Sequence, residues 1–163
     1  MDNIQKSDLV PIEIFDPGEQ QASKKEEITG FSLRLLQEGF KGENILISPL
    51  SIVSTLGMVA NGADGQTLAE MEQVLNSDIQ ELNDYLKAYI AYLPCSEKYK
   101  VSLANSIWFK DDESLTVNQE FLQTNKDYYD AGVYKAPFDE STKNAINNWV
   151  EDKTNGMIEK LLE

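Results

Sequence analysis

The segment over residues 50–59, LSIVSTLGMV, constrains the fold more than any other, because it is apolar on nearly every side of a helix. A helix without a polar face is buried rather than exposed, so we expect it at the centre of the protein. Its small residues Ser54 and Gly57 would let a neighbouring element pack closely against it. Ser48 is a candidate N-cap for this helix, and Pro49 fits its first turn, where no amide hydrogen bond is lost.

Hydrophobic periodicity predicts an α+β fold that is mostly helical, with a few strands of an incomplete large β-sheet. Capping boxes or caps are indicated at Thr67 with Glu70 and at Thr116 with Gln119, and Asn155-Gly156 is typical of a left-handed helix end. The expected elements are helices over 26–39, 49–60, 67–75, 79–93, 116–129 and 142–155, and strands over 44–47, 99–110 and 132–138.

The chain divides into two parts of different character. Residues 1–24 contain two prolines and a Pro-Gly turn without a helical period, and we expect them to form an irregular leader or tether. Residues 25–163 are expected to form the folded part, and they are long enough to bury a real core.

Composition excludes several classes of function. The formal net charge is −14, which disfavours binding to nucleic acid and to anionic membranes. No histidine is present, which removes Ser-His-Asp catalysis and His-ligated zinc, and a single cysteine permits no intrachain disulfide. The acid pairs Asp111-Asp112 and Asp139-Glu140 are interpreted as surface charge. We therefore expect no catalytic, cofactor-binding or metal site, no enzyme, and no membrane span.

One polar residue interrupts the apolar face of the strand expected over 99–110. Asn105 falls in the row of Leu103, Ile107 and Phe109. A buried amide costs about 1–3 kcal/mol unless its hydrogen bonds are made. Two interpretations remain open: Asn105 bonds the hydroxyls of Ser48 and Ser51 beneath the sheet, or it lies at an edge facing water.

Three segments of the chain resemble the serpin family of protease inhibitors. NILISPLSIVSTLGMVANGADGQTLAEM is similar to the family signature around its second helix, VSLANSIWF to the second strand of its large sheet, and INNWVEDKTNGMIEKLL to the helix that lies across that sheet. They occur in the family's order and at its spacing, and the resemblance covers roughly Glu26 to Leu162.

The resemblance implies roles for particular residues. Ser48, Pro49 and Ser51 match the shutter beneath the centre of the main sheet, and Asn105 matches the strand asparagine above it. The hydroxyls would then serve as hinge and hydrogen-bond groups rather than nucleophiles. On the sheet-covering helix, which must yield when the sheet opens, the matching residues are Asn147, Trp149, Thr154, Gly156 and Ile158. Met157 stands where the family usually has lysine.

The resemblance also implies what the whole protein does. Serpins trap serine or cysteine proteases when a cleaved loop near the C-terminus inserts into the large sheet. This sequence contains no counterpart of that reactive loop, so we expect an N-terminal serpin portion that does not inhibit a protease unless completed. The alternative is a non-inhibitory interaction module that pairs its exposed sheet edge with a partner chain. The leader favours an extracellular or cell-surface protein.

Overall fold

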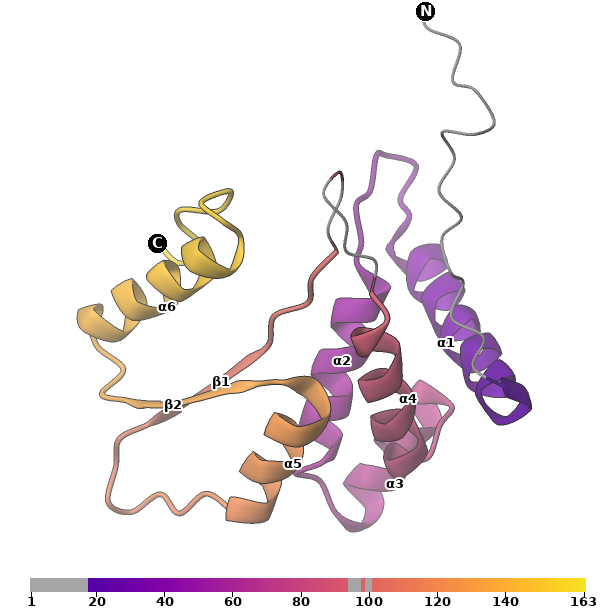
Figure 1. Cartoon of the computed structure of the whole chain (residues 1–163), viewed down its shortest axis with the longest axis horizontal. Coiled ribbons are helices and arrows are strands. Elements are labelled where there is room, and N and C mark those ends of the chain that lie inside the picture. The colour runs from indigo at the N-terminus through magenta and orange to yellow at the C-terminus, as the bar shows by residue number, and fades with distance from the viewer. Residues whose placement is uncertain (1–17, 94–97, 99–100) are drawn as a thin grey trace, which may run out of the picture.

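The structure is a computed structural model that describes residues 18–93, 98 and 101–163, with side chains from residue 23 onward. Within these residues the fold is α+β and mostly helical, which confirms the expected class (Figure 1). The elements are α1 (Gly18–Gly39), α2 (Pro49–Ala60), α3 (Gly65–Leu75), α4 (Ile79–Ala91), β1 (Ser106–Lys110), α5 (Gln119–Tyr129), β2 (Gly132–Ala136) and α6 (Glu140–Lys153).

The strands β1 and β2 pair in parallel, with α5 in the connection between them. Trp108 lies opposite Tyr134 in the register, and their rings stack with centroids 4.3 Å apart. Side chains alternate between the two faces of a strand. The preceding residue, Ile107, therefore points to the opposite face, where it packs against the helical core. The two faces of this sheet thus have different neighbours.

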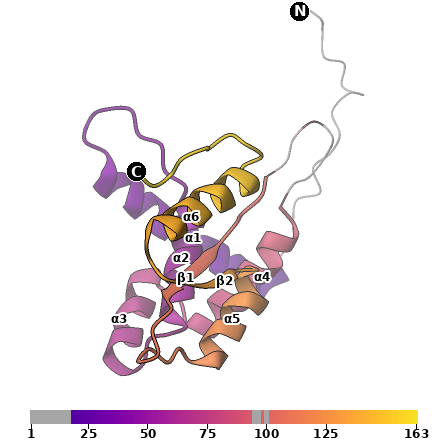
Figure 2. The same ribbon diagram turned by 90° about the vertical axis from the view of Figure 1, so that its left-hand side faces the viewer.

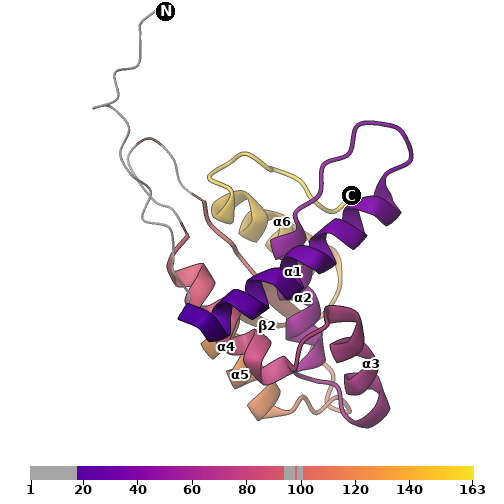
Figure 3. The same ribbon diagram turned by 90° about the vertical axis from the view of Figure 1, so that its right-hand side faces the viewer.

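The two strands lie between α6 on one side and the other helices on the other side (Figures 1 and 2). On the second side, α1 crosses α2, α3 and α4 (Figure 3). The core there is apolar and contains the buried side chains of Phe31, Val53, Met58, Leu75, Leu82, Tyr85, Leu86, Tyr129 and Ala131.

Helix α2 is the central element that its sequence predicts, but it is not buried on every side, since Val59 is 55% exposed. Val53, Ser54 and Gly57 are all buried within it. Gly57 is the point of closest approach, because a Cβ atom there would clash with the hydroxyl of Tyr129 on α5. The small residues of α2 therefore do admit a neighbour, and that neighbour is a tyrosine.

The strand expected over 44–47 is wrong for this structure. These residues have no regular structure, Ile45 is 39% exposed and Leu46 is 100% exposed. A strand is stabilised by hydrogen bonds to a neighbouring strand, and no described residue pairs with this segment. Ile45 and Ile47 instead approach the end of α1 at Gly39.

Two expected helix caps are also wrong. The Thr67–Glu70 capping box lies inside α3, whose N-cap is Asp64. Helix α5 is capped by Asn118, which accepts a hydrogen bond from the backbone of Glu120, rather than by the pair at 116 and 119. Asp64 precedes the expected cap of α3, and Asn118 lies closer to the start of α5 than Thr116 does. Asn and Asp are among the best N-cap residues.

Several boundaries also differ from those expected. Helix α1 begins at Gly18 rather than Glu26, so residues 18–24 are helical, and residues 1–17 of the expected leader lie outside the described residues. Strand β1 covers only 106–110, because β2 supplies partners only over that length. The left-handed end of α6 is confirmed, with φ of 52° at Asn155 and 78° at Gly156.

Candidate functional site

The two serines at the start of α2 bond each other. Ser48 occupies the N-cap position and is exposed, but its side chain makes no capping hydrogen bond to the helix backbone. Its Oγ instead lies 2.8 Å from the Oγ of Ser51, and Pro49 lies between them in the first turn. The two hydroxyls thus bond each other, and no histidine can act as a base beside them, since the whole chain lacks histidine. The arrangement suits a junction rather than a nucleophile.

Asn105 lies at the entry to β1 and is half-buried. Its side-chain Nδ2 donates to the carbonyl oxygen of Tyr129 over 3.3 Å. Its backbone carbonyl oxygen accepts from the amide of Gly132 over 2.9 Å. The structure therefore does not join Asn105 to Ser48 and Ser51 by a hydrogen bond. The residue fastens the start of β1 to the end of α5, since the backbone groups left over at that helix end are near it.

A buried polar network lies beside α2 and was not found from the sequence. Tyr129 donates its hydroxyl to Oδ1 of Asn83 over 2.6 Å, and the amides of Asn83 and Asn61 bond each other over 2.8 and 3.0 Å. Burial raises the pKa of Tyr129, so its hydroxyl stays protonated and remains a donor. The network joins α4, α5 and the end of α2. Asn83 lies on α4 beside other polar residues, and no sequence pattern indicates that Asn83 is the buried one.

Helix α6 faces the sheet across a cavity of about 530 Å³. Trp149 lines this cavity from α6, and Tyr134 and Gly132 line it from β2. The Nε1 atom of Trp149 is buried and makes no hydrogen bond with any described residue. Charged residues of both signs also line the cavity, namely Lys126, Asp130, Asp152 and Lys153. The helix thus covers the sheet without close packing along its whole length.

The polar residues of α6 bind the segment that follows the helix. Asn147 is 9% exposed and bonds the backbone of Leu161 and Leu162. Thr154 is half-buried, and its hydroxyl accepts from the amide of Ile158 over 3.0 Å. Gly156 has a positive φ of 78° at the reversal of the chain. All five residues matched to the sheet-covering helix therefore lie on α6 or on the turn and segment after it, while the Ser48–Ser51 pair and Asn105 lie elsewhere.

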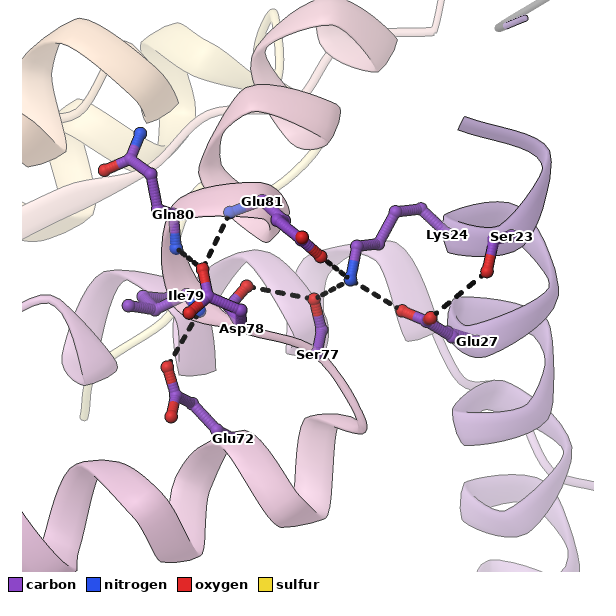
Figure 4. A network of polar contacts seen from close by, with 9 residues as sticks. All are labelled: Ser23, Lys24, Glu27, Glu72, Ser77, Asp78, Ile79, Gln80 and Glu81. Atoms are coloured by element: carbon purple, nitrogen blue, oxygen red, sulfur yellow. Dashed lines mark hydrogen bonds and ion pairs between the residues drawn. The ribbon is translucent and has the colours of Figure 1, made fainter. Parts of the chain in front are cut away.

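A further polar cluster joins α1 to the connection between α3 and α4 (Figure 4). Lys24 is 9% exposed, and its Nζ lies 2.9 Å from Glu27, 2.6 Å from Glu81 and 2.9 Å from Oγ of Ser77. Burial lowers the pKa of Lys24, but the bonds to the two glutamates outweigh that effect and the pKa lies above its usual value. The sequence does not predict this role for Lys24, because the residue falls in the expected irregular leader.

Within residues 18–93, 98 and 101–163, no group of three or more His, Cys, Asp or Glu side chains could hold a metal ion. No described helix is long and apolar enough to cross a membrane. The acid pair Asp111-Asp112 is exposed or nearly so, and Asp139 with Ser141 forms the cap of α6.

Comparison with known proteins agrees with the motifs. A family model described as "Serpin (serine protease inhibitor)" matches residues 26–163. Human neuroserpin (Homo sapiens) is 35% identical over 126 residues, which cover 74% of this chain and 30% of neuroserpin. An uncharacterized serpin-like protein of Methanosarcina acetivorans is 31% identical over 74% of this chain and 29% of its own length.

Solved structures give the same result. A loop C-sheet serpin polymer is similar with a TM-score of 0.81 and 45% identity over 94% of this chain and 41% of that chain. The latent state of the thermophilic serpin tengpin has a TM-score of 0.81 and 47% identity over 90% of this chain and 40% of its own. The chain thus spans less than half the length of these relatives. With the family model matching most of its residues, the chain belongs to the serpin family.

Proposed function

We propose that this chain is the N-terminal portion of a serpin domain, and that the whole protein inhibits serine or cysteine proteases by a suicide conformational trap. In such a trap a cleaved loop enters the large sheet as an added strand and releases stored strain. The observation that carries the proposal is the family match over residues 26–163, together with a parallel pair of strands that has a helix across one face.

We assign the shutter of that trap to Ser48, Pro49, Ser51 and Asn105. The support is local. The serine pair forms a self-contained junction at the start of the most buried helix, and Asn105 holds the end of α5 against the start of β1. In the complete protein these groups would set how easily the strands separate from the helices behind them. Their role is to hold and release, with no bond made or broken in a substrate.

We assign the cover of the sheet to α6. A helix that has to yield should be held by few specific contacts to the sheet. The cavity of about 530 Å³ between α6 and the strands supports this assignment.

The chain by itself is expected not to inhibit a protease. It covers 29–41% of the relatives and structures described above, and the family resemblance locates the reactive loop near the C-terminus of the complete domain. The test is a gel assay for covalent complexes. The complete protein should give a complex with a serine or cysteine protease that survives boiling in detergent, and the 163-residue chain should give none. Cleavage of the complete protein by every protease of a broad panel, without a stable complex, would overturn the inhibitory proposal.

A second candidate is a non-inhibitory module that pairs its sheet edge with another chain. The observation in its favour is that, within the described residues, the sheet consists of β1 and β2 alone, so each strand has one edge without a strand partner. Such edges recruit further strands. Two results together would favour this function. The 163-residue chain would form a stable complex with a strand-forming partner, and the complete protein would inhibit no protease.

A further inference from the structure

The segment after α6 folds back along that helix. Asn155 and Gly156 reverse the chain, and residues 157–163 then return beside α6, so that the C-terminal end lies next to the helix (Figures 1 and 2). We use the name return strap for residues 157–163. The strap has no helix or strand of its own.

Apolar packing holds the return strap only in part. Its large apolar side chains remain substantially in contact with solvent, with exposed fractions of 80% for Met157, 43% for Ile158, 58% for Leu161 and 38% for Leu162. Burial of an apolar side chain stabilises in proportion to the area removed from water. Because all four side chains keep a large exposed fraction, other contacts must contribute to holding the strap.

Hydrogen bonds hold the strap at its two ends. At the near end, Thr154 accepts the amide of Met157 through its carbonyl oxygen and the amide of Ile158 through its hydroxyl. At the far end, the single side chain of Asn147 makes three bonds. Its Oδ1 accepts the amides of Leu161 and Leu162 over 2.9 and 2.8 Å, and its Nδ2 donates to the carbonyl of Leu162 over 3.0 Å.

We propose that Asn147 is the latch of the return strap: its side-chain amide replaces the backbone partner that the strap lacks and fixes the strap on α6. A primary amide is suited to this task because it offers an acceptor with two lone pairs and a donor in one plane. Asn147 is 9% exposed in the middle of α6, so the same bonds also satisfy a buried polar group. With the latch closed, strap and helix move as one body.

The other polar side-chain contacts of α6 support this assignment. They are local to the helix, its cap or the turn after it, as in the ion pair of Lys143 with Glu140 and the bond from the amide of Phe138 to Thr142. Asn147 alone, among the described residues of α6, reaches fourteen and fifteen residues along the chain with its side chain.

One consequence rests on the proposed function. If α6 yields when the sheet opens, release of the latch would let the helix move without dragging the strap. The experiment below uses only the 163-residue chain, so its failure would remove the latch and leave the inhibitory proposal untouched. Failure of the complete protein to form a protease complex would remove the inhibitory proposal and leave the latch untouched.

The test is amide hydrogen exchange, read residue by residue by NMR. In Asn147→Ala, exchange at Leu161 and Leu162 should become about 10- to 100-fold faster, since their acceptor is lost, while amides within α6 such as Val150 stay protected. Asn148→Ala is the matched control, because Asn148 is the exposed neighbour and should change neither amide. Asn147→Asp keeps an acceptor for both amides but replaces the donor to the carbonyl of Leu162 by an oxygen, so both amides should exchange faster than in the parent chain and more slowly than in Asn147→Ala.

Three results would overturn the proposal. One is fast exchange at Leu161 and Leu162 in the parent chain. Another is unchanged exchange at both amides in Asn147→Ala. The third is equal loss of protection throughout α6 in that variant, which would show a general structural role. If Asn147→Ala does not fold, the parent chain and Asn147→Asp decide, because fast exchange at both amides in the parent chain, or no change at either amide in Asn147→Asp, contradicts the latch.

Discussion

Substitution of Gly57 by alanine should destabilise the protein, although glycine-to-alanine changes inside helices usually stabilise. In the interior of a helix, glycine is less stable than alanine by about 0.5–1 kcal/mol, because it loses more backbone entropy on folding. Gly57 lies inside α2, so propensity alone predicts that Gly57→Ala stabilises the protein. The structure predicts the opposite, since a Cβ atom at this position would clash with the hydroxyl of Tyr129.

The magnitude follows from the packing around that hydroxyl. Tyr129 is 2% exposed, and its hydroxyl is fixed by the bond to Asn83, so it cannot move away freely. Overpacking of a core by one methyl group costs about 1–3 kcal/mol. After the gain in helix propensity is subtracted, Gly57→Ala should lower the free energy of unfolding by about 1–2 kcal/mol.

The double variant separates the clash from other effects. In the Tyr129→Phe background the hydroxyl is absent, and the nearest ring atoms of residue 129 would lie 3.2 and 3.4 Å from the new Cβ. Gly57→Ala should then lower the free energy of unfolding much less than it does in the parent chain. The two substitutions should therefore couple favourably by about 1–2 kcal/mol, within the range usual for residues in contact.

Urea unfolding followed by circular dichroism measures all four proteins of this cycle. Gly30→Ala is the matched control, because Gly30 is also inside a helix and the nearest atom to its Cβ would be Nη1 of Arg34 at 3.7 Å. That control should be slightly stabilising. If Gly57→Ala stabilises the parent chain as much as Gly30→Ala does, the close approach of α5 to α2 is refuted.

Two further predictions concern Asn105 and Lys24. Asn105→Ala should lower the unfolding free energy by about 1–3 kcal/mol through loss of the bond to the carbonyl of Tyr129, and unchanged urea and thermal midpoints would contradict the hinge assigned to it. Lys24→Met keeps the apolar stem but removes the ammonium group, so α1 should detach from the turn at Ser77 and the thermal midpoint should fall. The folded pKa of Lys24 is raised, so its contribution is full below the unfolded pKa of about 10.4 and is lost as the pH rises through the folded value. The gap in midpoint between parent and Lys24→Met should therefore be constant near neutral pH and close at strongly alkaline pH, and a gap that persists there would count against the ion pairs.

The amino-acid sequence by itself determined the elements whose signals are local. A largely apolar segment made α2 the central helix, because its apolar side chains leave water on folding. Asn155-Gly156 ended α6 in the left-handed conformation, because few other residues adopt that backbone. The family was also accessible from the sequence, since its motifs are contiguous. The strand over 44–47 failed because strand formation depends on a partner, which a local pattern does not contain.

Tertiary structure decided the contacts between distant residues. Neither the bond of Asn105 to Tyr129 nor that of Asn147 to Leu161 and Leu162 follows from spacing, since each depends on where another element places its backbone. The same holds for Lys24, which joins α1 to Glu81 across 57 positions of the sequence, and for Tyr129 against Gly57. Periodicity identifies which face of a helix is buried. Only the packing of the helices determines which side chain meets that face, because many partners satisfy the same apolar pattern.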